Sequence, residues 1–244
     1  MINILKNIAR MDILKEKMLP KHLAIATRSL SLCEKQESRR EMIAIEKIKK
    51  LIENQVKINI PVISLQLDTS TDKDIKFLDE LLSYILDNPI IKDNKIRIMF
   101  IGKWFDFPVA ITENMKKITE ETKDYDKFFL NFLVKYDGKD EVISAIKLLT
   151  IKAVNKQIDA EEITPESIKE SLFSSYFLPP DIIIQCGYKY SGVLLWDSPG
   201  AIIHFTNNKH WATFDLKELD SALTKYKKAV DEEKRISASK ENQA

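Results

Sequence analysis

Short apolar runs of strand length alternate along this chain with longer segments in which apolar residues recur every three or four positions. Runs of the first kind are typical of buried strands, and spacing of the second kind is typical of helices that cover a core. The predicted strands are residues 20–26, 61–67, 96–101, 128–134, 182–184 and 193–196, and the predicted helices are residues 34–54, 75–87, 108–124, 139–155, 164–176 and 215–233. This alternation predicts an α/β fold in which helices flank a mostly parallel central sheet of about six strands.

The same pattern predicts a single domain at residues 20–235, a length that can bury one substantial core. Residues 1–19 carry apolar side chains at helical spacing. They are expected to form an N-terminal helix that docks on its own domain, and a helix lying on a membrane surface is the alternative. Residues 236–244 have no core residue after Ile236 and are expected to form a flexible tail.

Composition argues against several classes of function. The formal net charge is +1, so the chain has no basic surplus that would favour nucleic acid. Two cysteines are too few for a disulfide framework, and Cys186, His204 and His210 lack the spacing of a zinc site. No apolar run approaches the roughly 18 residues of a membrane span, and the five glycines form neither a G-x-G-x-x-G motif nor a P-loop. We expect a cytoplasmic protein with at most peripheral membrane contact.

The stretch at residues 178–196 reads L-P-P-D-I-I-I-Q-C-G-Y-K-Y-S-G-V-L-L-W. Its polar residues 185–192 lie between two apolar runs, where a loop often carries a binding site. The stretch resembles the C-terminal signature of the cis-prenyltransferases, the undecaprenyl diphosphate synthase family, in which two arginines hold a diphosphate. Gln185 takes the place of the first arginine, and Lys189 lies near the second. The matching residues are Pro180, Asp181, Gly187, Ser191, Leu194, Leu195 and Trp196.

Further blocks extend this resemblance over about residues 20–230. Residues 96–103 (I-R-I-M-F-I-G-K) are similar to a strand of the family, and residues 130–141 (L-N-F-L-V-K-Y-D-G-K-D-E) are similar to a block that ends in Asp-Glu. Residues 163–176 and 214–226 follow the family's order and spacing. The resemblance therefore implies the cis-prenyltransferase fold for most of the chain.

The family's metal-binding motif is altered. Residues 20–25 (P-K-H-L-A-I) resemble the segment before the aspartate that binds Mg²⁺ in the family, and Arg28 falls on the position of that aspartate. A guanidinium is always protonated and cannot ligate Mg²⁺, which takes oxygen ligands. The resemblance therefore implies no catalytic residue and no bound metal or cofactor in this chain, with Mg²⁺ held by a catalytic partner.

Four arginines are candidate contacts for a diphosphate: Arg28, Arg39, Arg40 and Arg235. The first three could form an anion site beside Lys21 and His22, because guanidinium groups bind such oxygens through paired hydrogen bonds. Ordinary ion pairs on the surface are the alternative.

The pattern also resembles the non-catalytic subunits of heteromeric cis-prenyltransferases, the Nogo-B receptor type. Ser191-Gly192 and Trp196 fit that subgroup better than the catalytic version. In the subgroup a C-terminal R-x-G tail reaches into the partner's active site. Arg235 is the nearest equivalent here, and a solvated charge is the alternative reading of that residue.

The resemblance implies a non-catalytic subunit that supports a catalytic cis-prenyltransferase in a heterodimer or heterotetramer. The partner would condense isopentenyl diphosphate with an allylic diphosphate to make a polyprenyl diphosphate. The interface is expected chiefly in the last strands and in residues 148–176. Two alternatives are a divergent, active homodimeric prenyltransferase and a stand-alone protein that binds isoprenyl diphosphates.

Overall fold

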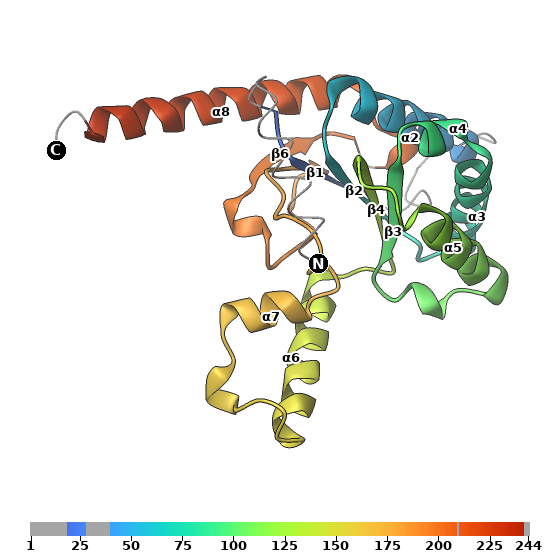
Figure 1. Cartoon of the computed structure of the whole chain (residues 1–244). Helices are drawn as coiled ribbons and strands as arrows, with labels where there is room; N and C mark the ends of the chain where they lie inside the picture. Colours follow the sequence, from blue (N-terminus) through green and yellow to red (C-terminus); the bar gives the residue numbers. More distant parts are fainter. Residues whose placement is uncertain (1–18, 28–39, 209, 242–244) are drawn as a thin grey trace.

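The structure is a computed structural model of the chain, and it describes residues 19–27, 40–208 and 210–241. In chain order its strands are β1 (His22–Ala26), β2 (Val62–Leu67), β3 (Ile96–Ile101), β4 (Phe128–Val134), β5 (Ile182–Cys186) and β6 (Ile202–Thr206). Its helices are α2 (Arg40–Ile58), α3 (Asp72–Asp87), α4 (Pro89–Asp93), α5 (Val109–Thr122), α6 (Gly138–Val154), α7 (Pro165–Ser171) and α8 (Lys217–Glu241). Strands and helices alternate as predicted (Figure 1).

The six described strands form one sheet in the order β3-β4-β2-β1-β5-β6, and every pair of neighbours is parallel. The predicted α/β fold with a parallel central sheet is confirmed. β1 lies beside both β2 and β5, and the chain leaves β1 toward β2 on one side and reaches β5 on the other. In sheets of this kind, ligands bind at the carboxyl ends of the strands near such a change of direction.

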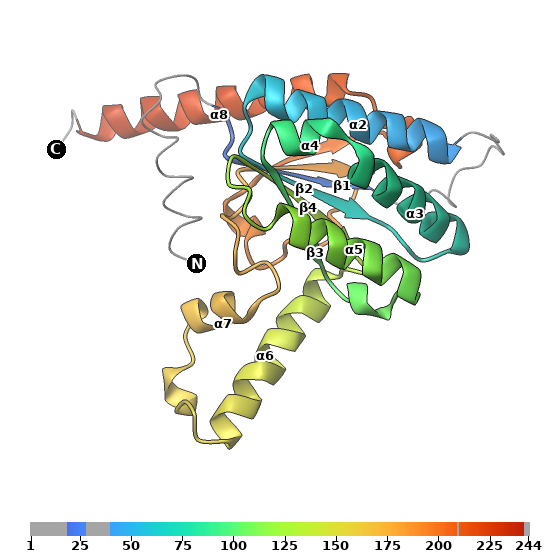
Figure 2. The same ribbon diagram turned by 45° about the vertical axis from the view of Figure 1, so that its right-hand side comes forward.

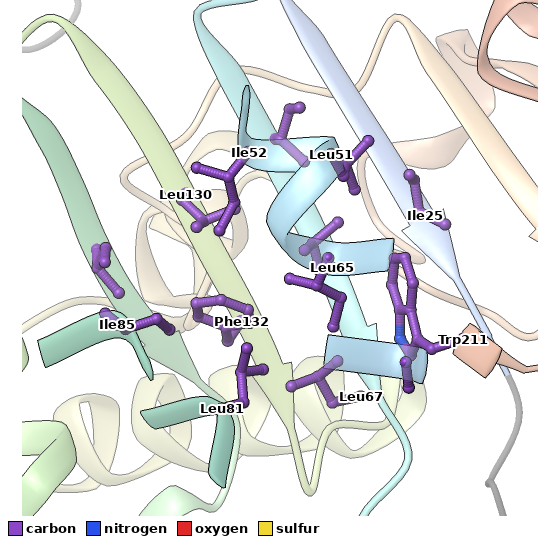
Figure 3. Packing of buried hydrophobic residues seen from close by; sticks show 14 of the residues in the cluster. Ile25, Leu51, Ile52, Leu65, Leu67, Leu81, Ile85, Leu130, Phe132 and Trp211 are labelled. Atoms are coloured by element: carbon purple, nitrogen blue, oxygen red, sulfur yellow. The ribbon is translucent and has the colours of Figure 1, made fainter. Parts of the chain in front are cut away.

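One face of the sheet is covered by α2, α3, α5 and the first part of α8 (Figure 2). The large core lies between these helices and the sheet, and Ile52, Leu65, Phe132 and Trp211 meet within it (Figure 3). A smaller cluster on the opposite face includes Ala24, Ile183, Val193 and Leu194. The strands are therefore buried on both faces, which explains why they read as continuous apolar runs.

Helices α6 and α7 lie side by side and extend away from the sheet (Figures 1 and 2). We call residues 138–171, from the start of α6 to the end of α7, the arm. Asp137 caps the start of α6 by accepting hydrogen bonds from the backbone N–H groups of Lys139 and Asp140. The side chain of Thr164 caps α7 in the same way.

The predicted strand at residues 193–196 is wrong, and the sixth strand is β6 instead. Residues 193–196 form a turn in which Leu194 has φ +49, a left-handed conformation that a strand cannot contain. Val193 and Leu194 are nevertheless buried, because the turn packs on the face of the sheet. The segment is apolar because part of it is buried, so its composition resembles that of a strand although its backbone forms a turn.

Several helix limits also differ from the prediction. Helix α2 continues to Ile58, and the short helix α4 was not predicted. Helix α8 continues to Glu241, so most of the expected tail is helical. Its last residues are mainly alanine, lysine, glutamate, arginine and serine, which include several of the strongest helix formers, and no glycine or proline interrupts them. The predicted N-terminal helix lies outside the described residues, as do the first residues of the helix predicted at 34–54.

In the described part of the chain, we find no helix that is both long enough and apolar enough to cross a membrane.

Candidate functional site

The carboxyl ends of β1, β2 and β4 surround a pocket of about 440 Å³. Each of these strands ends at the same edge of the sheet, so the residues that follow them come together there. The residues that line the pocket are Thr27, Gln66, Leu67, Asp68, Thr69, Ser70, Lys135, Tyr136 and Asp137. This position is the one at which a parallel sheet usually binds its ligand.

Gln66, near the end of β2, links the segments around this pocket. Its backbone carbonyl accepts a hydrogen bond from Thr27 Oγ1 at 3.2 Å and from Trp211 Nε1 at 3.3 Å. Its side-chain Oε1 accepts from Ser191 Oγ at 3.4 Å. Gln66 thus links the end of β2, on which it lies, to the end of β1, the loop after β5 and the segment before α8.

The loop at residues 187–192 is closed by its own hydrogen bonds. Gln185 is buried at the end of β5, and its Oε1 accepts the backbone N–H of Ser191 at 2.9 Å. Its Nε2 donates to the carbonyl oxygen of Cys186 at 3.1 Å. The position expected to carry a diphosphate-binding arginine therefore holds a neutral amide that is already engaged within its own loop. Lys189 is exposed on the same loop.

The charged groups of the pocket are engaged in local structure. Lys135 is the one basic residue among the described lining residues, and its Nζ donates to the carbonyl oxygen of Asp106 at 2.7 Å. Asp68 Oδ1 accepts from the backbone N–H of Ser70 at 3.1 Å, and Asp137 caps α6. The lining is rich in oxygen atoms and poor in positive charge, so the described lining residues offer an anion little electrostatic attraction.

The predicted arginine contacts are not brought together in the described part of the chain. Arg28 and Arg39 lie outside the described residues. Arg40 is buried at the start of α2 and does not line the pocket. Arg235 is exposed near the far end of α8, which projects beyond the sheet, and its Nη1 lies 3.8 Å from Glu232 Oε2 (Figure 1). A role of these arginines toward a diphosphate stays a prediction.

His22, beside which an anion site was predicted, does not line this pocket. It is fully buried at the amino end of β1, the end remote from the pocket. Its Nδ1 lies 2.6 Å from the carbonyl oxygen of Leu178, which can only accept, so Nδ1 carries the proton. Its Nε2 then accepts from Ser64 Oγ at 2.8 Å, and Ser64 Oγ accepts from Asn131 Nδ2 at 3.0 Å.

Burial lowers the pKa of His22 from 6.5 to about 4, although its hydrogen bond to Leu178 opposes the shift. The imidazole is therefore neutral near pH 7 and cannot attract an anion. Its role is to fix residue 178 against the sheet.

Tyr136 and Glu141 are the interacting residues that sequence reasoning missed. Tyr136 lines the pocket, and its Oη donates to Glu141 Oε2 at 2.5 Å. Burial and the nearby Glu141 charge raise the pKa of Tyr136 far above its usual value, so the phenol stays protonated. The sequence shows Glu141 within an acidic helix start, which is typical of solvent-exposed carboxylates, and nothing local marks it as buried.

Comparisons with known proteins agree with the fold. Residues 32–235 match the protein-family model described as "Putative undecaprenyl diphosphate synthase". The chain belongs to this family, the cis-prenyltransferases. The match begins after β1 and so does not include Arg28.

Two cis-prenyltransferase relatives illustrate the similarity. A tritrans,polycis-undecaprenyl-diphosphate synthase (geranylgeranyl-diphosphate specific) from Methanocaldococcus jannaschii is 26% identical over 227 residues, which cover 86% of this chain and 81% of the relative. An isoprenyl transferase from Streptococcus pneumoniae is 30% identical over 178 residues, covering 69% of this chain and 70% of the relative.

A solved cis-prenyltransferase-like structure confirms the fold. Lavandulyl diphosphate synthase from Lavandula x intermedia, in complex with dimethylallyl diphosphate, superposes with a TM-score of 0.77 at 16% sequence identity. The superposition covers 87% of this chain and 97% of that protein. At this identity the likeness shows the cis-prenyltransferase fold alone.

Proposed function

We propose that this chain is the non-catalytic subunit of a heteromeric cis-prenyltransferase. Its partner would be a catalytic subunit that condenses isopentenyl diphosphate with an allylic diphosphate to make a polyprenyl diphosphate. The assembly would be a heterodimer or a heterotetramer, and the catalytic partner would hold the Mg²⁺. Names of the relatives support the reaction class, because they describe undecaprenyl diphosphate synthase and isoprenyl transferase activities.

The observation that carries the proposal is that Gln185 is uncharged, buried and hydrogen-bonded within its own loop. A catalytic site for this chemistry must neutralise the charge that develops on a departing diphosphate. At the position where the family signature places an arginine, this chain has a buried, uncharged amide bound to its own loop. Arg28, at the position of the metal-binding aspartate, supports the same conclusion from the sequence.

The arm supports the presence of a partner. Large apolar side chains are exposed on the side of α6 opposite its buried residues Glu141, Ala145 and Leu149: Ile143, Ile146, Ile151 and Val154. An exposed apolar stripe of this kind is typical of a protein interface, because a soluble surface rarely leaves such a patch uncovered. A pocket of about 350 Å³ between the end of β3 and the arm is lined by Phe100, Trp104 and Tyr176, together with Leu148 of α6. We assign this surface to the second prenyltransferase subunit.

A divergent homodimeric enzyme is the second candidate, and the 440 Å³ pocket favours it. The pocket lies at the carboxyl ends of the strands, where a parallel sheet usually binds its ligand, and Asp68 and Asp137 put carboxylates beside it. In that case the apolar side of α6 would bind a second copy of this chain. A stand-alone protein that binds isoprenyl diphosphates would use the pocket without the exposed surface, so the arm argues against it.

The test is to measure prenyltransferase activity, with Mg²⁺ and both substrates, for this chain alone, for the catalytic homologue of the same organism alone, and for the two co-expressed. Activity that rises sharply only in the mixture, with the two proteins co-eluting, is the expected result. Turnover by this chain alone would contradict the proposal and support the homodimeric enzyme. Diphosphate binding by the isolated chain without assembly would support the third alternative.

An interface variant with a matched control makes this test sharper. Ile151→Arg places a charge on the apolar side of α6, where Ile151 is 57% exposed. Val109→Arg makes the same kind of change at an exposed residue of α5, where the side chain is 76% exposed. We expect Ile151→Arg to abolish co-elution and the gain in activity, whereas Val109→Arg leaves both unchanged. Equal behaviour of the two variants would remove α6 from the interface.

A further inference from the structure

The arm meets residues 187–192 at a crowded junction. We call these residues the pocket loop, because Ser191 contacts Gln66 of the pocket wall. Gly138, the first residue of α6, lies so close to the loop that a Cβ at this position would clash with the carbonyl oxygen of Gly192. The same Cβ would lie 2.7 Å from Leu195 Cβ. The first turn of α6 therefore packs directly on the turn that follows residues 187–192.

The buried side chain of Glu141 forms hydrogen bonds to both segments at this junction. Its side chain is buried, with 1% of the residue exposed, and both carboxylate oxygens have partners. Oε2 accepts from Tyr136 Oη at 2.5 Å, and Oε1 accepts from the backbone N–H of Ser174 at 2.7 Å. Tyr136 belongs to the pocket wall and Ser174 to the segment that follows α7, so one carboxylate joins two segments that are distant in sequence.

Tyr136 extends the connection to the turn. Its Oη accepts the backbone N–H of Leu194 at 3.2 Å while it donates to Glu141. Leu194 has φ +49, a backbone conformation that is unfavourable for a leucine and persists only where its surroundings hold it. The hydrogen bond from Leu194 to Tyr136 is one of the contacts that hold it.

A second connection lies beside the first. Lys169 of α7 forms an ion pair with Asp197, whose side chain is only 6% exposed, and its Nζ also donates to the carbonyl oxygen of Ser174 at 3.3 Å. The peptide groups on both sides of Ser174 are thus bound, the N–H by Glu141 and the carbonyl by Lys169. Separating buried groups of this kind from their partners costs free energy, so the arm and the turn are expected to move together.

We propose that Glu141 is a positioning residue that sets the turn at residues 193–197 and couples it to the binding of a second subunit on the arm. The coupling part rests on the proposed function. The apolar side of α6 is the surface where the subunit would bind, and Glu141 lies in the first turn of the same helix. The turn continues the loop whose Ser191 contacts Gln66 at the pocket, so a subunit bound to the arm stabilises the pocket loop as well. Because such coupling is reciprocal, ordering of the loop strengthens subunit binding.

Hydrogen exchange measured by mass spectrometry tests this directly. Leu194 is buried, with 1% exposed, so a partner cannot shield its amide by direct contact, and any change there must be transmitted. Binding of the catalytic homologue to the wild-type chain is expected to slow exchange several-fold in peptides that cover residues 187–197. Peptides from β2 and β4, in which every residue except Gln66 is buried, serve as the internal reference.

Glu141→Gln keeps the shape of the side chain but replaces one of its two acceptor oxygens with an NH₂ group. A single oxygen must then accept from both Tyr136 Oη and the backbone N–H of Ser174. In the isolated variant, we expect exchange to accelerate at residues 172–177 and 187–197 and not in β2 or β4, and partner binding no longer to slow it. Asp140→Asn is the matched control, because it removes a neighbouring charge from the same helix start, where Asp140 is exposed and paired with Lys103. Tyr136→Phe removes only the hydroxyl group and should reproduce the effect at residues 187–197, which keeps the test valid if Glu141→Gln does not fold.

The experiment distinguishes failure of this inference from failure of the proposed function. If the homologue binds and the wild-type turn shows no change, or if Glu141→Gln retains the full change, the proposal is wrong. If no homologue binds, the proposed function fails, and the isolated variants still decide the positioning role. Exchange in Glu141→Gln and Tyr136→Phe that is as slow as in Asp140→Asn would then overturn it.

Discussion

The two faces of the sheet are built from different kinds of residue, although the same strands supply both. The face toward α2, α3 and α5 carries large apolar side chains at alternating positions: Ile25, Leu65, Leu130 and Phe132. The opposite face combines large apolar side chains such as Phe129, Leu133 and Ile183 with small or polar ones: Ala24, Ser64, Gln66 and Asn131. The first face stabilises the fold through buried apolar area, and the second holds particular segments in place through hydrogen bonds.

The difference shows how one sheet serves two purposes. Small side chains on the second face let the segment at residues 177–180 and the turn at residues 193–197 approach the strands closely. Those segments lead to the pocket loop and to the arm, so their position matters for binding. The large apolar face needs no such precision, because packing there depends on volume and shape more than on particular partners.

The largest expected effect compares two phenylalanines of β4 that point to opposite faces. Phe132 lies in the large cluster, with its ring 5.6 Å from that of Phe100, whereas Phe129 packs in a small cluster with Val62 and Leu178. Phe132→Ala is expected to lower the free energy of unfolding by about 5 kcal/mol and Phe129→Ala by about 3 kcal/mol. Urea unfolding of both variants measures the difference. Equal losses would contradict the assignment of stability to the first face.

The next effect concerns pH and belongs to the second face. The folded-state pKa of His22 is lowered from 6.5 to about 4, so below pH 6.5 the unfolded chain binds a proton that the folded chain does not. His22 therefore does not lower the free energy of unfolding above pH 6.5. As the pH falls from 6.5 to about 4, the free energy of unfolding decreases by about 3 kcal/mol.

Urea unfolding between pH 7 and about pH 4 measures this loss, with His22→Gln as the reference for all other titrating groups. The wild type should lose more stability over this range than His22→Gln. Parallel curves for the two proteins would show that His22 is not held neutral in the folded state.

The smallest of the three effects tests the hydrogen-bonded chain itself. Ser64→Ala removes the group that donates to His22 and accepts from Asn131, both of which are fully buried. A loss of about 1–3 kcal/mol is expected, because two buried polar groups are left without this partner. Ser83→Ala on the exposed side of α3 removes a hydroxyl that donates to its own helix and should change stability little. A Ser64→Ala protein as stable as Ser83→Ala would mean that the second face does not depend on its polar contacts.

The strands that sequence reasoning located well are those with apolar runs clearly bounded by polar residues. The predicted limits of β3 and β4 agree with the structure residue for residue. The parallel order could also be inferred, because helices long enough to cross over separate most of the strands. Residues 187–192 form a loop after β5, as predicted, whereas the roles of Tyr136, Glu141, Lys169 and Asp197 were not predicted.

Those residues could not be found because their partners are far away along the chain. Glu141 contacts Ser174, and Lys169 contacts Asp197, so whether each side chain is buried or exposed depends on how the arm folds back. Short-range patterns report the burial of a segment and not the identity of its neighbours. The same limit explains residues 193–196, whose apolar character is correct and whose strand geometry is wrong.

The sequence by itself determined the alternation of strands and helices, the parallel sheet and the family signature around residues 178–196, because each of these depends on local spacing. Only the tertiary structure decided that Gln185 is bound within its own loop, that Glu141 is buried between the arm and the pocket, and that Leu194 adopts a left-handed turn. The physical reason is that hydrogen bonds and burial between distant segments form only after the sheet has brought those segments together, and local sequence does not encode which groups will meet.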